Sequence, residues 1–206
     1  MTSPASPASR RLDEPLPSGH RPHVMPWWLG PLLVNPLRRL TTDPKALLAP
    51  LVKLGDTALE IGPGYGFFTR FLAEAVGQDG RVVCVDVQPQ MLRGLERRLD
   101  RFRLRGRVET RQCSTSDLGV EDLDASVDLV VAVNVVHEMS RPAAALAQMA
   151  GTLRSGGRLW LVEPRGHCPE NVFCAELRWL EQAGLRRIEE PQRTRARRQA
   201  ATFLRP

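Results

Sequence analysis

The segment with the clearest potential for chemistry is glycine-rich and spans residues 60–66, with the sequence Glu-Ile-Gly-Pro-Gly-Tyr-Gly. Its glycines permit positive φ angles and let a backbone approach a ligand closely. A dinucleotide fingerprint would place its third glycine one residue beyond Gly66, against a pyrophosphate, so a pyrophosphate is not the expected ligand. Glu60 would repel phosphates, and its carboxylate suits a cation such as an ammonium or a sulfonium group.

A second acidic residue supports this interpretation. Asp86 ends the apolar run 82–86, 20 residues beyond Gly66. An acid at this spacing is expected to accept hydrogen bonds from both hydroxyls of a ribose. The glycine segment alone could be no more than a tight turn between a strand and a helix, but together with Asp86 it predicts a nucleoside-binding site.

The elements that must position these residues alternate along the chain. Five short, β-branched runs predict strands that are covered on both faces, at 57–61, 82–86, 108–112, 127–133 and 158–162. Segments with helical periodicity lie between or after them, at 67–76, 89–103, 142–153 and 170–183. Residues 185–189 and 200–204 predict a final antiparallel pair. The order predicts an α/β fold with a Rossmann-like, doubly wound, seven-stranded, mostly parallel sheet.

The N-terminal part has a different composition. Residues 1–26 hold six prolines and few large apolar side chains, which predicts a flexible tail before a single domain at 27–206. Trp27 and Trp28 open an apolar segment that we expect to pack on the domain as a lid or a brace. Asp43 and Pro44 predict a helix start that continues over 46–54.

Composition excludes several classes of protein. The 206 residues carry a formal charge of +6, but positions 27–190 hold equal numbers of basic and acidic residues. The excess lies mainly in the C-terminal arginines Arg193, Arg195, Arg197, Arg198 and Arg205. The four cysteines form no C-x-x-C pair, so no disulfide or zinc framework is expected. The sequence holds no run of the roughly 20 apolar residues that a membrane span needs and no secretory signal, which favours a cytoplasmic protein.

These motifs resemble those of class I S-adenosylmethionine-dependent methyltransferases. The resemblance covers residues 27–206 and includes residues 128–138 as a fourth-strand motif and 153–159 as the turn before the fifth strand. It implies S-adenosylmethionine as cofactor and S-adenosylhomocysteine as product. It further implies that Glu60 faces the amino end of the cofactor and that Asp86 binds the ribose. The remaining residues implied to contact the cofactor are Gly62, Pro63, Gly64 and Gly66 at its methionine part and Val87 and Met91 beside the adenine.

One position departs from the family pattern. The loop after the third strand usually offers an aspartate to the adenine amino group, and here Ser114 stands at that place, between Cys113 and Thr115. A hydroxyl is a weaker acceptor than a carboxylate. We expect adenine recognition to come from Ser114 and from the backbone of Thr115, with reduced affinity.

The segment after the fourth strand holds the candidate catalytic residue. Asn134 is not followed by the two prolines and the aromatic residue of amine-methylating enzymes, which argues against DNA adenine methylation. It is expected to line the sulfur end of the cofactor. His137 could act as a general base oriented by Glu138, or it could line the pocket without proton transfer. His167 and Cys168 match no zinc pattern, and no metal is expected.

The leading hypothesis is methyl transfer to a small or medium-sized, partly apolar metabolite, because the body of the chain is neutral and aromatic residues lie near the expected site. The alternatives are an RNA or protein methyltransferase that uses the C-terminal arginines, and a non-catalytic cofactor-binding protein, which Ser114 would favour. Nucleic acid is the less favoured partner because a charge run is usually a solvated face. The sequence does not determine the acceptor or the oligomeric state.

Overall fold

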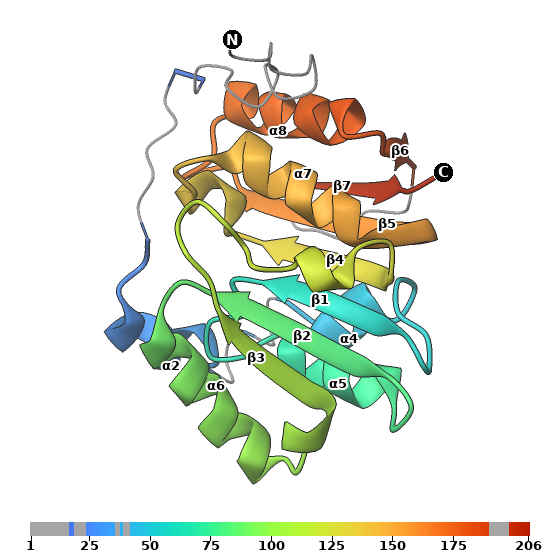
Figure 1. Ribbon diagram of the computed structural model, residues 1–206. Coiled ribbons are helices and arrows are strands. Elements are labelled where there is room, and N and C mark those ends of the chain that lie inside the picture. Colours follow the sequence, from blue (N-terminus) through green and yellow to red (C-terminus); the bar gives the residue numbers. More distant parts are fainter. Residues whose placement is uncertain (1–16, 19–23, 36–37, 39–41, 190–197) are drawn as a thin grey trace, which may run out of the picture.

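The fold is known from a computed structural model, which describes residues 17–18, 24–35, 38, 42–189 and 198–206 (Figure 1). Its core is a seven-stranded sheet with the strand order β3-β2-β1-β4-β5-β7-β6. The first five strands are parallel to one another, and β7 is antiparallel to both β5 and β6. The strands are β1 (Thr57–Ile61), β2 (Arg81–Asp86), β3 (Val108–Gln112), β4 (Val127–Val133), β5 (Leu153–Pro164), β6 (Arg186–Ile188) and β7 (Arg198–Leu204).

Helices cover both faces of this sheet. The main ones are α4 (Pro44–Leu48), α5 (Thr69–Val76), α6 (Pro89–Arg101), α7 (Pro142–Thr152) and α8 (Glu170–Gln182). Alternate strand residues point to opposite faces. Leu59 of β1 therefore packs in one core with α7 and α8, and Ala58 in another with α4, α5 and α6. The doubly wound, mostly parallel sheet predicted from the sequence is confirmed.

Several boundaries differ from the predicted ones, most of them by one or two residues. The predicted helix at 46–54 ends at Leu48. Ala49 keeps helical backbone angles as its C-cap, and Pro50 has no N–H group to continue the helical hydrogen bonds. β5 begins at Leu153 rather than at Arg158. Leu153 pairs with Val127 of β4, and after a register shift Arg158 pairs with Leu129. The helix predicted from residue 67 begins at Thr69.

The C-terminal antiparallel pair predicted at 185–189 and 200–204 is confirmed as β6 and β7. The arginine loop between these strands, which includes Arg193, Arg195 and Arg197, lies outside the described residues. The same holds for residues 1–16 and 19–23, so the flexible tail and the domain boundary at residue 26 stay predictions.

The N-terminal segment is helical, as η2 (Trp27–Leu29) and α2 (Gly30–Leu33). The expectation that its tryptophans are covered by the domain is wrong, because Trp27 is 46% and Trp28 63% exposed. The residues just before them, Val24, Met25 and Pro26, instead line the main cavity. In the described part of the chain, no helix is long and apolar enough to cross a membrane.

Candidate active site

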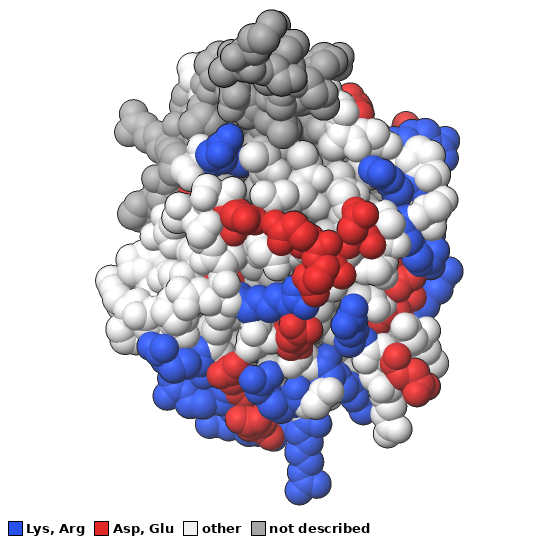
Figure 2. Space-filling view, viewed as in Figure 1, with Lys and Arg blue, Asp and Glu red and all other residues white. Residues whose placement is uncertain are grey.

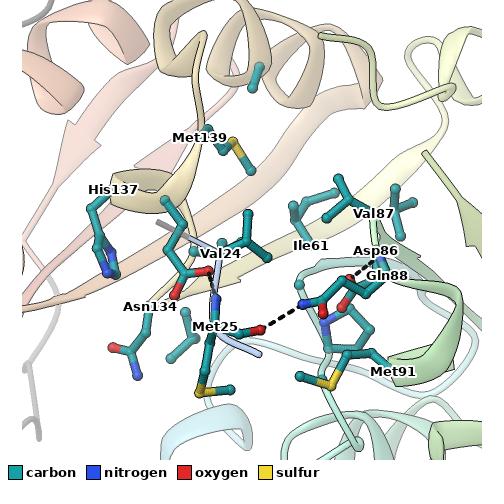
Figure 3. Close-up of a pocket in the computed structure, with 18 of the residues that line it drawn as sticks. Val24, Met25, Ile61, Asp86, Val87, Gln88, Met91, Asn134, His137 and Met139 are labelled. Atoms are coloured by element: carbon teal, nitrogen blue, oxygen red, sulfur yellow. Dashed lines mark hydrogen bonds between the residues drawn. The ribbon is translucent and has the colours of Figure 1, made fainter. Parts of the chain in front are cut away.

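A cavity of about 990 Å³ lies at the carboxyl ends of the central strands. Strand β1 has β2 on one side and β4 on the other, so the strand order reverses here, at the place where ligands bind in open α/β sheets. Figure 3 shows Asn134 and His137 on one side of this cavity and Asp86, Val87 and Met91 on the other. The volume is near the upper end of the roughly 300–1,000 Å³ typical of small-molecule sites, which leaves room for two ligands.

The glycine loop joins β1 to α5 and forms part of the cavity wall. Gly62, Gly64 and Gly66 all have positive φ, at 65°, 54° and 80°. A Cβ at Gly62 would lie 2.5 Å from Val135, so this position has no room for a side chain. Pro63 lines the cavity together with Gly62 and Gly64.

Gly66 is the predicted binding residue that does not line the cavity. A Cβ there would lie 2.4 Å from Leu95 of α6, and its carbonyl accepts a hydrogen bond from Arg98. Its positive φ and this tight packing show why the loop requires a glycine at a position without ligand contact.

Asp86 ends β2 with its carboxylate at the cavity wall. Its Oδ1 accepts a hydrogen bond of 2.9 Å from the backbone N–H of Gln88. Burial raises the pKa of Asp86 to about 6, although backbone N–H groups of Gln88, Gly64 and Val87 oppose that rise. The carboxylate is thus positioned to accept hydrogen bonds from a polyhydroxylated ligand, most strongly above pH 6.

Glu60 lies deeper, beneath the glycine loop, and is almost fully buried. Its Oε2 accepts a hydrogen bond of 2.6 Å from the Thr69 hydroxyl, and the Cys84 thiol lies 3.7 Å away. Burial raises the pKa of Glu60 to about 7, against the opposing hydrogen bonds from Thr69 and Cys84. Near neutral pH, part of the population therefore holds an uncharged carboxyl at this place.

The loop after β3 holds Ser114 and Thr115, and both line the cavity. The Ser114 hydroxyl accepts a 3.0 Å hydrogen bond from the backbone N–H of Asp117. The Ser114 N–H in turn donates to the Asp117 carbonyl at 3.0 Å. The serine therefore closes a turn within the loop, and this turn brings Asp117 to the cavity wall.

Asn134 follows β4 in a left-handed backbone conformation, with φ of 56°, which asparagine tolerates better than most residues. Its N–H donates to the Val162 carbonyl at 2.7 Å. Its side-chain Oδ1 is buried and has no hydrogen-bond partner among the residues that the structure describes. A buried acceptor without a donor is costly, so this atom is arranged to meet a donor from a ligand.

His137 lies in η5 (Val136–Glu138), and its ring lines the cavity. Its Nδ1 is hydrogen-bonded to Oε2 of Glu163, near the end of β5. The other oxygen of Glu163 accepts the Val136 N–H at 2.8 Å. This fixes the ring through Nδ1 and leaves Nε2 for other partners, the arrangement of a base held by a carboxylate.

The carboxylate that orients His137 is therefore Glu163. The sequence suggested Glu138 for this role. Glu138 points elsewhere and accepts the Met25 N–H at 3.3 Å. Burial lowers the pKa of His137, but the hydrogen bond and the charge of Glu163 outweigh it, so the net pKa is raised above 6.5.

Met25 is a further cavity residue that the sequence analysis did not single out. Its carbonyl accepts a 2.8 Å hydrogen bond from the Gln88 side chain, while its N–H donates to Glu138 (Figure 3). The Met25 backbone thus lies between the two sides of the cavity. No local sequence pattern predicts the hydrogen bond between Met25 and Gln88, because the two residues lie 63 positions apart.

A further buried carboxyl, Glu176 of α8, lies close enough to Glu163 to interact with its charge. It is fully buried, and burial followed by the charge of Glu163 raises the pKa of Glu176 well above its ordinary value of 4.5. The folded chain therefore holds a proton that the unfolded chain releases above pH 4.5. The free energy of unfolding then falls as the pH rises above 4.5, by up to about 1.4 kcal/mol per pH unit from this group.

The substitution Glu176→Gln removes this loss of stability, since glutamine resembles the protonated acid. The gain in the free energy of unfolding of the variant over the unchanged chain should be larger at pH 8 than at pH 6, by at least about 1 kcal/mol. Urea unfolding of both proteins at both pH values measures this difference. Glu181→Gln, at an exposed position of the same helix, serves as the control and should show no such difference. An equal effect of Glu176→Gln at both pH values would contradict a buried neutral carboxyl.

Comparison with known proteins places this site in a family. The family model described as a methyltransferase domain matches residues 59–161, half of the chain, from β1 to the middle of β5. The chain belongs to the S-adenosylmethionine-dependent methyltransferase family. The matched region contains the glycine loop, Asp86 and the segment around His137, so the resemblance found in the sequence is confirmed, and S-adenosylmethionine is the family's cofactor.

Among curated proteins, the chain is similar to two relatives over about half its length. It is 34% identical over 110 residues to an uncharacterized 37.1 kDa protein in transposon Tn4556 of Streptomyces fradiae, a match that covers 53% of this chain and 30% of that protein. It is 32% identical over 113 residues to the ubiquinone/menaquinone biosynthesis C-methyltransferase UbiE of Teredinibacter turnerae, with coverages of 54% and 44%. The matched segment is thus less than half of either relative.

Among solved structures, a SAM-dependent methyltransferase from Aquifex aeolicus is similar over 89% of this chain and 100% of its own, with a TM-score of 0.77 and 23% identity. A putative S-adenosylmethionine-dependent methyltransferase from Methanococcus maripaludis is similar over 87% of this chain and 90% of its own, with a TM-score of 0.68 and 15% identity. These likenesses extend the class I methyltransferase fold beyond the segment that the family model matches.

Proposed function

We propose that this chain transfers a methyl group from S-adenosylmethionine to a small or medium-sized, partly apolar acceptor that carries an ionisable proton. The observation that carries the proposal is the His137–Glu163 pair, which places a carboxylate-oriented imidazole on the wall of a cavity built around the glycine loop. General-base help from such a residue typically accelerates proton removal about 10²–10⁴-fold.

The residues of the cavity fit the cofactor. Asp86 would accept hydrogen bonds from the ribose hydroxyls, and Val87 and Met91 would flank the adenine. Asn134 offers its unpartnered Oδ1 to a donor such as the amino group. When bound, S-adenosylmethionine supplies a methyl group on a sulfonium, which is already reactive. The protein then has to hold the acceptor in line and exclude water.

Ser114 and Glu60 have less direct roles in this proposal than the family pattern implies. The Ser114 hydroxyl accepts the Asp117 N–H within the turn. Adenine recognition would therefore come from the backbone of Thr115 and from the neighbouring Asp117. Glu60 is bonded to Thr69 and would act on the cofactor's amino end from beneath the loop, with a charge that depends on pH.

The nature of the acceptor is inferred from the lining of the cavity as a whole. Apolar side chains make up much of that lining, including Leu29, Phe67 and Met139. A phenol or an enol combines an apolar body with a proton that imidazole removes, and its loss makes oxygen or an adjacent carbon nucleophilic. The relative named for C-methylation in ubiquinone/menaquinone biosynthesis supports including such acceptors. The RNA or protein alternative depends on the C-terminal arginines, of which Arg193, Arg195 and Arg197 lie outside the described residues, and no described contact favours it.

The test has two stages, of which the first is calorimetric titration with S-adenosylmethionine and S-adenosylhomocysteine. Binding of both in the micromolar range is expected, and the absence of binding would favour a non-catalytic protein. The second stage measures formation of S-adenosylhomocysteine with matched phenol, enol, amine and thiol acceptors. Turnover confined to the phenols and enols supports the proposal, whereas turnover with the amines or thiols alone would overturn the acceptor class.

A further inference from the structure

The N-terminal segment exposes an unusual amount of apolar surface. Five large hydrophobic side chains are exposed among the described residues. Four of the five lie between positions 24 and 32. This exposed apolar patch consists of Val24 (41%), Trp27 (46%), Trp28 (63%) and Leu32 (64%). Several exposed apolar side chains within one short segment are typical of an interaction site, whereas single exposed hydrophobic residues need no explanation.

The patch is held in a defined place beside α6. A Cβ at Gly30, the first residue of α2, would lie 2.4 Å from the ring of Tyr65, and a Cβ at Gly94 of α6 would lie 2.5 Å from the same ring. Tyr65 is therefore inserted between α2 and α6, with a glycine on each side. Figure 1 shows the two helices next to each other at this edge of the molecule.

The neighbouring helix brings positive charge to the same edge. Residues 89–107 hold seven arginines and two acids, although the body of the chain is neutral overall. The arginines on the exposed surface of this stretch are Arg93, Arg97, Arg101, Arg103 and Arg105. Figure 2 shows Lys and Arg gathered over the α6 region at the lower left, below a largely uncharged surface.

We propose that the exposed apolar patch and the arginines of α6 together dock the protein on a membrane surface that contains anionic lipids. Tryptophan rings favour the boundary between headgroups and acyl chains, and a helical segment with Trp and Leu next to arginines is typical of interfacial binding. Arginines near the surface are attracted to anionic headgroups. The aliphatic members of the patch, Val24 and Leu32, suit acyl chains and have no counterpart in the stacking of nucleic-acid bases.

The patch is also continuous with the mouth of the cavity. Val24 belongs to both, and Leu29, the last residue of η2, lines the cavity as well. Docking on a bilayer would place this mouth against the lipid. An apolar acceptor could then enter from the membrane, a step that rests on the proposed function, whereas the docking itself does not.

The test uses the full chain and vesicles of phosphatidylcholine, with and without phosphatidylglycerol, in a sedimentation assay at low and at physiological salt. We expect binding to the anionic vesicles, with a shift of tryptophan emission to shorter wavelength. The triple change Trp27→Ser, Trp28→Ser and Leu32→Ser should weaken this binding at least tenfold and remove the emission shift. The change Arg93→Gln with Arg97→Gln and Arg101→Gln should weaken it and reduce its dependence on salt.

Leu54→Ser is the matched control, since Leu54 is 81% exposed but lies outside the patch, and it should bind vesicles like the unchanged chain. Thermal unfolding verifies that each variant is folded. Equal binding by the apolar-patch variant, or no binding to anionic vesicles at low salt, would overturn the proposal. The proposal would also be overturned if single-stranded RNA bound through the arginines and competed with the vesicles. A dimer that covers both tryptophans would overturn it as well. Because vesicle binding is measured without turnover, its failure leaves methyl transfer untouched.

Discussion

Replacing Asp86 with alanine is expected to weaken the binding of S-adenosylmethionine at least about 100-fold. The carboxylate faces the cavity from the end of β2, where it would accept two hydrogen bonds from ribose hydroxyls. Hydrogen bonds to charged groups contribute about 1.5–3 kcal/mol each, and a factor of 100 corresponds to about 2.8 kcal/mol. Calorimetric titration of the variant and of the unchanged chain measures the ratio of the two dissociation constants.

The pH dependence of binding provides an independent check on this residue. The ionised form of Asp86 is the acceptor and its pKa is raised to about 6, so affinity for the cofactor should fall as the pH drops through 6. Asp86→Asn keeps one acceptor oxygen for the Gln88 N–H and cannot ionise. It should bind with intermediate affinity and with a smaller fall, of which the remainder comes from Glu60, whose pKa is raised to about 7. Unchanged affinity in a folded Asp86→Ala variant would remove Asp86 from the site.

The second large effect is expected at His137. The change His137→Asn should lower kcat about 10²–10⁴-fold, while the dissociation constant of S-adenosylmethionine stays within a factor of about three. Glu163→Gln should lower kcat less, because glutamine still accepts the Val136 N–H but no longer supports a charged ring. Steady-state kinetics with the best acceptor from the panel, together with calorimetry of the cofactor, measures both parameters.

The pH profile separates a positioning role of Glu163 from a merely structural one. The base works as neutral imidazole, so kcat should rise with pH through the raised pKa of His137, above 6.5. Loss of the Glu163 charge lowers that pKa, and the rise in kcat should move to lower pH in Glu163→Gln. Glu138→Gln, the alternative partner suggested by the sequence, should leave the position of the rise almost unchanged. If Glu138→Gln moves it and Glu163→Gln does not, the assignment of the pair is wrong.

The sequence predicted those parts of the site that are contiguous or tied to strand ends. Residues 60–66 and Asp86 could be placed because a glycine loop and an acid at the ends of successive parallel strands meet at one sheet edge. Glu163 could not be assigned in this way. It lies 26 residues from His137, and the only sign in the sequence is an acid at the end of an apolar run, which is equally compatible with a surface residue.

Hydrophobic content predicted the location of the N-terminal segment but not which of its side chains would be covered. The tryptophans were expected to be covered because they are the largest apolar residues there. In the structure the backbone of Met25 makes the contacts with Gln88 and Glu138 instead. Backbone hydrogen bonds do not depend on residue type, and composition therefore gives no signal for them.

The ring of Tyr65 between Gly30 and Gly94 has a consequence for how this chain can change over evolutionary time. Neither glycine can gain a Cβ while the ring is present, since both positions would lie within 2.5 Å of it. A smaller residue at position 65 would release both constraints at once. The three positions, from the N-terminal segment, the glycine loop and α6, are thus expected to vary together among relatives that retain this segment, and a relative without the aromatic ring should also tolerate larger residues at both glycine positions.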